Sequence, residues 1–450
     1  MVKLKEESKM KSKKLFGLFI FIVVLFCLSG AAFAEGDAPK IDTGDTTFNI
    51  LSTVLVFIMT PGLAFFYGGM VRKKNVLNTM MSSFVIIAIV SIQWVLIGYT
   101  LAFGPDKGHL LGGLDWLGFN SVGGDPNAAY AATIPHASFA MFQMMFAIIT
   151  PALITGAIAE RMRFPALIIF VTLWSFLVYD PLAHWVWGVG GWLRNLGALD
   201  FAGGTVVHIS SGISGLVACI MLGKRKKSSS MTPHNIPFVL LGAGLLWFGW
   251  FGFNAGSALQ ANGAALNAFV TTNTAAAAAT LSWILIEYFH HGKATILGAA
   301  TGAVIGLVAI TPGAGFVTPM YSIIIGLLVS PICYFAITVI KSKFGYDDAL
   351  DAFGCHGIGG IWGAIATGIF ANYGGAKGLI SGNPVQLLYQ LIAVAVTIVL
   401  AIVMTVLILK VTSLFTKLRV SEQDEDDGLD IAEHGEDAYP DFTSEQSIIL

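Results

Sequence analysis

The strongest constraint on this sequence is a series of apolar segments, each about 20 residues long, that recurs through most of the chain. A helix of that length is what the ~30 Å hydrocarbon core of a bilayer requires. Only 12% of the residues are charged, far below the roughly one quarter usual in soluble domains. We therefore expect an all-α membrane protein with eleven transmembrane helices, and neither an enzyme nor a nucleic-acid-binding protein. The segments are 47–70, 76–103, 137–159, 165–187, 203–222, 236–256, 266–288, 294–311, 319–340, 352–372 and 385–410.

The two ends of the chain differ in composition from this apolar region. The first 34 residues combine a basic start, an apolar run and the small-residue sequence Ala32-Phe33-Ala34, which is the layout of a cleavable signal peptide. An uncleaved first helix is the alternative. The stretch 421–450 has eleven Asp or Glu and no Lys or Arg, a composition typical of a solvated, partly disordered tail. We expect a signal peptide at 1–34, a membrane domain at 35–416 and a tail at 417–450.

Basic residues predict the orientation in the membrane. Twelve of them lie in the odd-numbered connections between segments, and three lie in the even-numbered ones. The side rich in Lys and Arg is normally cytoplasmic, which places the N-terminus outside and the C-terminus inside the cytoplasmic membrane. The twelve are Arg72, Lys73, Lys74, Arg161, Arg163, Lys224, Arg225, Lys226, Lys227, Lys293, Lys341 and Lys343.

Two histidines lie inside predicted membrane helices. His208 comes eight residues after Asp200, roughly 12 Å along a helix axis, and His356 lies in the segment 352–372. Glycines follow each histidine at offsets of four and seven: Gly212 and Gly215, and Gly360 and Gly363. An ionisable residue at membrane depth is costly and marks a functional site by default. The alternatives are a hydrogen-bonded polar residue between helices or a pair of axial haem ligands.

The histidine segments are the fifth and the tenth, which suggests a repeat of five spans. A five-span unit repeated directly must be inverted in the membrane, because five is odd, and inverted repeats place the site near the midplane. We therefore expect an inverted five-helix repeat plus one extra helix, with one pore per subunit. Adjacent imidazoles in a dry pore could not both be charged, so we expect two neutral rings that share a hydrogen bond.

Aromatic residues gather near the outer ends of several segments. Phe142 and Phe146 lie four residues apart on one helix face, and Trp250 and Phe253 lie near the end of the sixth segment. Each is compatible with an interfacial belt or with packing. A group of Trp and Phe beside a hydroxyl such as Ser257 can also bind a small cation without a counter-charge.

Several long stretches resemble the ammonium transporter (Amt/Mep/Rh) family, in particular its bacterial Amt branch. They are DFAGGTVVHISSGISGLVACIMLGKR (200–225), MTPGLAFFYGGMVRKKN (59–75), FQMMFAIITPALITGAIAERMRF (142–164), WFGFNAGSA (250–258), DAFGCHGIGG (351–360) and GLDIAEHGEDAY (428–439). The resemblance covers essentially the whole chain after the signal peptide. It implies transport of ammonium or ammonia across a bacterial cytoplasmic membrane, without a cofactor or metal.

The resemblance also implies a role for individual residues. Trp187, Phe146 and Ser257 would recruit ammonium at the outer face, with Phe142 in the vestibule and Trp185 as a second candidate. Phe146 and Phe253 would form a gate, with Trp250 lining the pore. His208 and His356 would be the twin histidines of that pore, which passes neutral ammonia after the cation is deprotonated. Asp200 would be a supporting carboxylate; the physical alternative is a helix cap.

Assembly and partners follow from the same resemblance. It implies a homotrimer in the lipid bilayer and a tail that packs across subunits, where a P-II type nitrogen-regulatory protein could block the pores. An ammonium sensor of the same fold is the alternative function.

Overall fold

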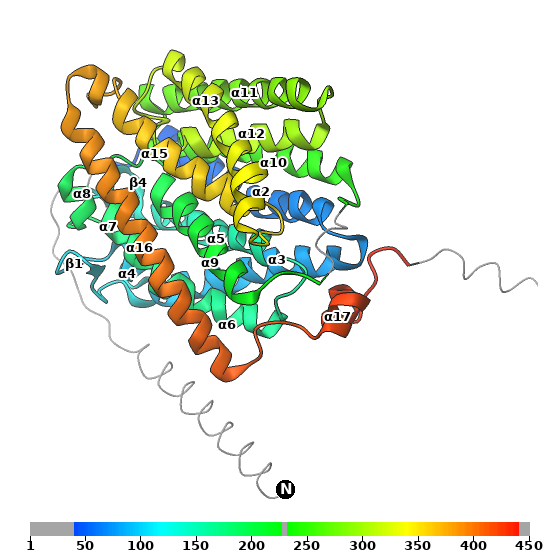
Figure 1. Ribbon diagram of the computed structural model, residues 1–450. Coiled ribbons are helices and arrows are strands. Elements are labelled where there is room, and N and C mark those ends of the chain that lie inside the picture. Colours follow the sequence, from blue (N-terminus) through cyan, green and yellow to red (C-terminus); the bar gives the residue numbers. More distant parts are fainter. Residues whose placement is uncertain (1–39, 227–231, 441–450) are drawn as a thin grey trace, which may run out of the picture.

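The computed structural model describes residues 40–226 and 232–440, and helices form most of that part of the chain (Figure 1). The predicted signal peptide and the last ten residues of the tail lie outside the described residues. Ten helical stretches of the described part are long and apolar enough to cross a membrane. They are Thr43–Met70 (α2), Lys73–Phe103, His136–Ile158 (α5), Phe164–Leu196, Gly204–Leu222, Ile236–Ala258, Gly263–His291 (α11), Pro319–Phe344, Phe353–Phe370 and Pro384–Phe415 (α16).

The remaining predicted segment, 294–311, is the eighth of the eleven and forms a shorter helix, α12 (Ile296–Ile310), of 15 residues. At 1.5 Å per residue it is about 22 Å long, less than the thickness of the hydrocarbon core. Nearly all of its residues from Ala300 onward are buried among other helices, and the turn at Pro312-Gly313 follows it. A helix enclosed by protein need not match the lipid thickness. The count of eleven full-length spans is therefore not confirmed.

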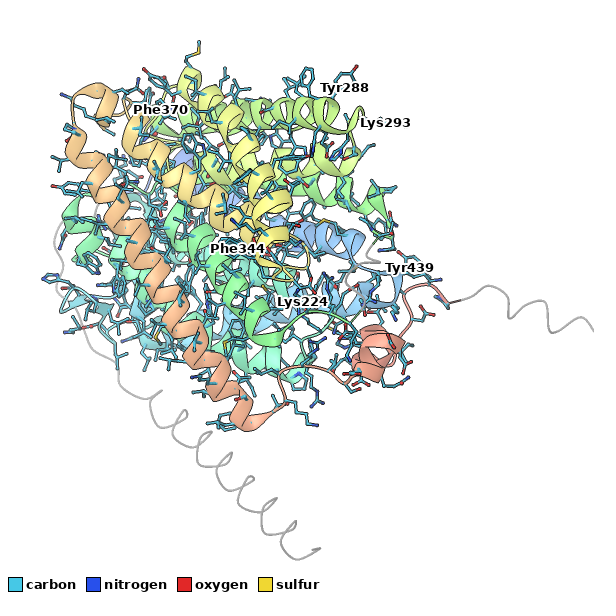
Figure 2. All side chains as sticks on the ribbon, viewed as in Figure 1. Lys224, Tyr288, Lys293, Phe344, Phe370 and Tyr439 are labelled. Carbon is cyan, nitrogen blue, oxygen red and sulfur yellow. The ribbon has the colours of Figure 1, made fainter. Side chains whose placement is uncertain are left out.

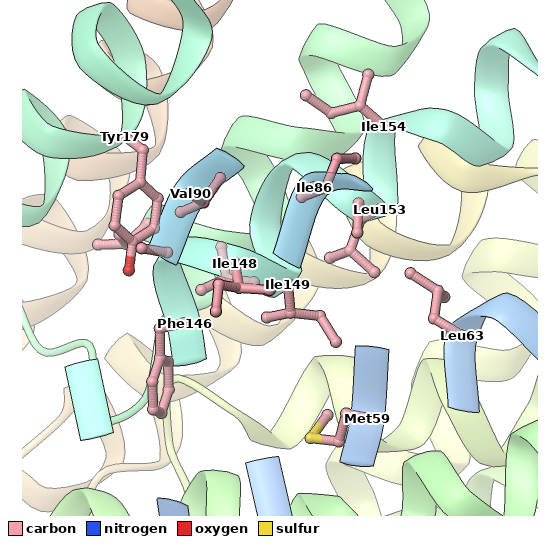
Figure 3. Packing of buried hydrophobic residues seen from close by; sticks show 14 of the residues in the cluster. Met59, Leu63, Ile86, Val90, Phe146, Ile148, Ile149, Leu153, Ile154 and Tyr179 are labelled. Carbon is pink, nitrogen blue, oxygen red and sulfur yellow. The ribbon is translucent and has the colours of Figure 1, made fainter. Parts of the chain in front are cut away.

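Helix α5 lies at the centre of the molecule. It is apolar all round and buried along most of its length, as expected for a helix surrounded by others. Its Ile149 and Leu153 lie toward Met59 and Leu63 of α2 (Figure 3). The opposite side of α5 packs against Ile86 of α3 (Val76–Gln93).

The loop between the second and third spans is shaped by two short hairpins. Strand β1 (Asp106–Lys107) pairs with β2 (Leu111–Gly112), and β3 (Pro126–Asn127) pairs with β4 (Ala131–Pro135), both antiparallel. The first hairpin lies at the same end of the molecule as α7 (Asp180–Trp187) and α8 (Trp192–Leu196), on the left of Figure 1.

The described part of the acidic tail, as far as Pro440, contacts the basic end of the molecule through a few buried residues, while most of its side chains stay exposed. Short helices α17 (Glu422–Asp427) and η11 (Asp430–His434) follow α16. The Asn78 backbone N–H donates to Asp430 at 2.8 Å, and the Leu429 N–H donates to Asn75 at 2.8 Å.

Charge complementarity explains why this tail packs. Glu425 pairs with Arg419 at 2.6 Å, and Glu433 lies 3.7 Å from Arg163. Tyr439 and Lys293 lie toward the same end of the molecule in Figure 2, and Phe370 lies toward the other. Acidic tail residues thus oppose the basic connections that the sequence places on one side.

Candidate functional site

The two histidines belong to helices that cross in direct contact. His208 lies in η5 (Gly204–Ile209), which continues as α9 (Ser210–Leu222), and His356 lies in η9 (Phe353–Ile358), which continues as α15 (Gly359–Phe370). A Cβ added to Gly212 would lie 2.1 Å from the Gly357 nitrogen. One added to Gly360 would lie 3.1 Å from the His208 Cβ. The glycine four residues after each histidine therefore packs against the helix of the other histidine.

The two imidazole rings lie side by side in space with nearly parallel planes. Their centroids are 5.4 Å apart and their planes differ by 16°. His208 is 1% exposed and His356 is 3% exposed. Within the described residues, three ring nitrogens have no hydrogen-bond partner: Nδ1 and Nε2 of His208 and Nδ1 of His356. The expected hydrogen bond between the rings is thus not made.

The stacked rings border a very small apolar chamber. Its volume is about 10 Å³, which is close to the space that one water-sized molecule occupies. Such a chamber is too small for a haem, so the haem alternative does not fit. The lining residues are Met59, Leu63, Phe66, Ile149, Leu153, Val207, His208, Leu246, Trp250, Phe253, Val304 and His356.

Aromatic rings separate this chamber from the end of the molecule at which Trp187 lies. The rings of Phe146 and Phe253 lie 4.3 Å apart, both side chains being buried. Trp250 stacks on His208 at 5.4 Å, and its indole N–H donates to the Thr311 hydroxyl at 2.9 Å. Phe142 packs behind Phe146 at 5.0 Å and is fully buried.

A wider cavity of about 190 Å³ lies on the other side of these rings. Trp187 and Ser257 both line it, whereas Trp185 and Phe142 do not. The Trp187 ring stands at 85° to Phe146 with centroids 6.0 Å apart, and its indole N–H donates to the Asp200 carbonyl at 2.9 Å. The remaining lining residues are Phe103, Tyr130, Phe139, Gln143, Phe146, Val186, Arg194, Phe201 and Leu259.

Gln143 was missed by the sequence reasoning. It is adjacent to Phe142, and its side-chain oxygen is buried without a partner among the described residues. A polar residue between Phe142 and Phe146 on the same helix was the sequence feature that could have identified it.

The carboxylate of Asp200 holds the start of the first histidine helix. It accepts hydrogen bonds from the backbone N–H groups of Gly203, Gly204 and Thr205 at 2.6–2.8 Å, and from the Thr205 hydroxyl. A carboxylate there satisfies free amides and faces the positive end of the helix dipole. This geometry favours the cap interpretation of Asp200.

Asp348 occupies the matching place on the second histidine helix. It lies eight residues before His356, as Asp200 lies eight before His208. Its carboxylate accepts from the Ala352 and Phe353 N–H groups at 3.0 and 2.8 Å. Burial raises the pKa of Asp348 to about 6. The sequence reasoning overlooked it, although the offset of eight could have identified it.

The basic end of the molecule carries a buried ion-pair cluster beside a third cavity of about 460 Å³. Arg225 donates to Asp347 at 2.5 and 2.8 Å and to Glu160 at 3.2 Å, and Arg72 also pairs with Glu160. Burial opposes the charge of Asp347, but the hydrogen bonds and charge of Arg225 outweigh it and lower its pKa to about 2. Arg72 likewise outweighs burial at Glu160, so the pKa of Glu160 lies below its ordinary value.

In the described part of the chain, ten long apolar helices and a narrow, histidine-lined chamber, with a wider cavity toward each end of the molecule, define an all-helical membrane protein of the transporter class. The sequence matches the model of the Ammonium Transporter Family over residues 47–439. The chain belongs to the ammonium transporter family.

Two bacterial relatives carry the same description. An ammonium transporter of Bacillus subtilis (strain 168) is 58% identical over 402 residues, which cover 88% of this chain and 99% of the relative. An ammonium transporter of Aquifex aeolicus (strain VF5) is 50% identical over 414 residues, covering 91% and 96%. The family and these relatives are transporters and not enzymes.

Solved structures show the same fold. Saccharomyces cerevisiae Mep2 matches with a TM-score of 0.80 at 37% identity, over 88% of this chain and 94% of that chain. A structure described as a sensor Amt protein matches with a TM-score of 0.80 at 31% identity, over 87% and 98%.

Proposed function

We propose that this chain recruits ammonium at the outer cavity, deprotonates it and passes neutral ammonia through the histidine-lined chamber. The observation that carries this proposal is the chamber itself. Among the described residues that line it, the side chains are apolar apart from the two histidines and the Trp250 indole, and the indole N–H is already bonded to Thr311. A bare cation in such apolar surroundings loses its hydration without replacement, which costs many kcal/mol. Ammonia is neutral and of about the size of water, so it fits both the volume and the polarity.

The outer cavity supports the recruitment step. Trp187 and Phe146 offer two aromatic rings at right angles, and the Ser257 hydroxyl lies on the same wall. Ammonium can be held there by cation–π attraction and by donating a hydrogen bond. Potassium cannot donate hydrogen bonds or lose a proton, so it gains less at the mouth and does not pass in neutral form.

The unpartnered histidine nitrogens support the conduction step. The buried Nδ1 and Nε2 of His208 and the Nδ1 of His356 can each donate to or accept from a small molecule in the chamber. The Phe146–Phe253 pair would act as a gate between cavity and chamber. Asp200 would act through the helix whose start it holds.

The repeat is part of this proposal. Gly215 packs against Ala157 of α5, and Gly363 packs against the Ala309 carbonyl of α12. These are the third and eighth helical segments, five apart, as are the two histidine helices. The matched contacts support an inverted five-helix repeat with one pore per subunit. In this repeat α12 is the short eighth of eleven spans, and α16 is the additional helix.

Orientation and assembly complete the proposal. The basic end with the folded tail would be cytoplasmic in a bacterial plasma membrane, and the Trp187 end would be outside. By its family resemblance the chain would form a homotrimer. A P-II type regulatory protein would meet the face formed by the tail and the cavity near Lys224.

An ammonium sensor is the second candidate function, favoured by the likeness to the sensor Amt structure. Growth of a transport-deficient bacterial strain on low ammonium separates the two. We expect this chain to restore growth and His208→Ala to fail, with equal membrane expression. A wild-type chain that is expressed but restores no growth favours the sensor.

A further inference from the structure

His184, near the outer end of α7, lies between two hydrogen-bond acceptors. Its Nδ1 is 3.0 Å from the Ala102 carbonyl oxygen, and its Nε2 is 2.9 Å from Oδ1 of Asp106. The side chain is fully buried. A carbonyl oxygen and an ionised carboxylate can only accept, so both ring nitrogens must carry a proton when both bonds are made. The pair is then an imidazolium and a carboxylate.

Other contacts support the ionised state of Asp106. Burial opposes its charge, but the hydrogen bond from His184, with that from the His109 backbone, outweighs burial and lowers the pKa of Asp106. Asp106 also lies directly against Gly190: a Cβ added to Gly190 would be 2.5 Å from the Asp106 Cβ.

The same hairpin holds the end of α7 at two further points. The indole N–H of Trp185 donates to the Leu110 carbonyl at 2.8 Å, and His109 Nδ1 donates to the Gly190 carbonyl at 2.7 Å. We call the Asp106–His184 pair with these two contacts the outer clasp. It joins β1–β2 to the last turn of α7 and to the loop that follows.

That last turn carries Trp187, three residues after His184. The backbone carbonyl of Trp187 accepts a hydrogen bond from Arg194 at 2.6 Å. Two residues further on, the Val189 N–H donates to the Tyr130 hydroxyl at 3.0 Å. Tyr130, Arg194 and Trp187 all line the outer cavity. Movement of the helix end would therefore change the wall that is proposed to receive ammonium.

We propose that Asp106 and His184 are positioning residues of the outer ammonium site: the doubly protonated His184 holds the end of α7 so that Trp187 faces the cavity, and loss of one ring proton weakens ammonium binding. This inference rests on the proposed function of Trp187. The direction of the pH dependence follows from the number of ring protons on His184. With two protons the clasp makes all its hydrogen bonds, and with one proton, at higher pH, it loses one of them.

The other charged and titratable groups around the clasp do not account for such a change. His109 Nδ1 donates to the Gly190 carbonyl and also lies 3.2 Å from Asp106 Oδ2, but a neutral ring can supply this one donor. Arg194 contacts the Trp187 carbonyl and is not a partner of His184. Burial raises the pKa of Tyr130 to about 12, so its hydroxyl keeps its proton. His184 is the group in the clasp that needs a second proton.

The test compares apparent KM and maximal current for ammonium in reconstituted vesicles at several values between about pH 5 and 8, where imidazole changes charge. We expect the wild-type KM to rise with pH. Asp106→Ala should have a KM raised about three- to thirtyfold at all pH values, the range that a cation–π contact supplies, with a smaller change in maximal current.

Asp106→Asn provides the discriminating result. Its side-chain amide can donate to Nε2 of a neutral His184, whose Nδ1 still donates to Ala102, so the clasp closes without the extra proton. We expect a near-normal KM that no longer depends on pH in this way. The pore histidines are unchanged in this variant, and Asp115→Asn, an exposed site in the same loop, serves as the matched control.

Two results would overturn the proposal: a KM of Asp106→Ala equal to that of the Asp115→Asn control, or an unchanged pH profile in Asp106→Asn. If Asp106→Ala does not fold, the Asp106→Asn profile alone decides. Ammonium-binding isotherms of the purified proteins over the same pH range test the clasp without transport. If the wild-type protein binds ammonium in a pH-dependent way but transports none, the proposed function is contradicted and the clasp is supported. If its ammonium binding does not depend on pH, the clasp is contradicted.

Discussion

The imidazole rings of His208 and His356 stack within 16° of parallel at a centroid distance of 5.4 Å, without a hydrogen bond between them. A pair that bonded to itself would have used one nitrogen of each ring. Here those nitrogens are left for a molecule that enters the chamber, and the apolar walls leave it little other polar contact. The unbonded ring nitrogens therefore give the chamber its polar character.

The first prediction concerns His208. His208→Ala removes two ring nitrogens and enlarges a chamber of about 10 Å³, so selection for a small neutral molecule should weaken. We expect the ratio of ammonium to potassium flux to fall at least about tenfold, equivalent to ~1.4 kcal/mol. The measurement is current from reconstituted vesicles after jumps of each ion. Ile209→Val, in the same helix turn, is the control, and an unchanged ratio in His208→Ala would refute the role of the ring.

The second prediction concerns Trp187. Trp187→Ala removes a cation–π face worth about 0.5–2 kcal/mol, so apparent KM for ammonium should rise about three- to thirtyfold while maximal flux changes less. Trp187→Phe keeps a ring but loses the hydrogen bond to Asp200, and its KM should lie between those of wild type and Trp187→Ala. Equal KM values for all three proteins would place recruitment elsewhere.

The third prediction concerns the contact between the histidine helices. A Cβ at Gly212 would lie 2.1 Å from backbone of the other helix, whereas one at Gly244 would meet nothing within 4 Å. Gly212→Ala should therefore destabilise the protein by at least ~1–3 kcal/mol, the usual cost of overpacking, and Gly244→Ala should not. Thermal unfolding in detergent provides the comparison. Equal unfolding temperatures would mean that the helices can separate freely.

The fourth prediction concerns acid stability. The pKa of Asp347 is lowered to about 2 by Arg225, so its stabilising contribution is complete above about pH 5 and is lost as pH falls toward 2. Asp347→Asn leaves a buried arginine without its main partner and should cost about 3–5 kcal/mol at neutral pH. Its unfolding temperature should then depend less on pH than that of the wild type or of Asp125→Asn, an exposed site. A parallel pH profile for Asp347→Asn would show that the pair does not govern acid stability.

The sequence predicted the helices and the histidine pair because both depend on local spacing. Apolar length defines a span, and glycines four residues after His208 and His356 lie on the same helix face as the histidines. The family resemblance supplied Trp187, Phe146 and Phe253, and in the structure the Phe146 ring lies next to both other rings. None of these required knowledge of a distant contact.

Other features depended on contacts between distant segments. The short α12 is possible because protein encloses it. The acidic tail folds because the Lys226 N–H donates to Glu425 and Arg163 lies 3.7 Å from Glu433, both far away in sequence. The ring orientation of the histidines depends on how their helices cross. The spacing of Asp348 was visible in the sequence, but its value as a cap became clear only beside Asp200.

The most direct test of the central claim is an ammonium jump on solid-supported membranes that carry the reconstituted wild-type protein and His208→Ala, with potassium as the competing ion and vesicle pH recorded in parallel. We expect an ammonium-specific signal, as current or as a pH change caused by ammonia entry, that is diminished in His208→Ala. A current without a matching response to potassium would indicate charge movement coupled to the pore, and a pH change alone would indicate passage of neutral ammonia. Wild-type protein that gives neither signal would contradict conduction through the histidine-lined chamber.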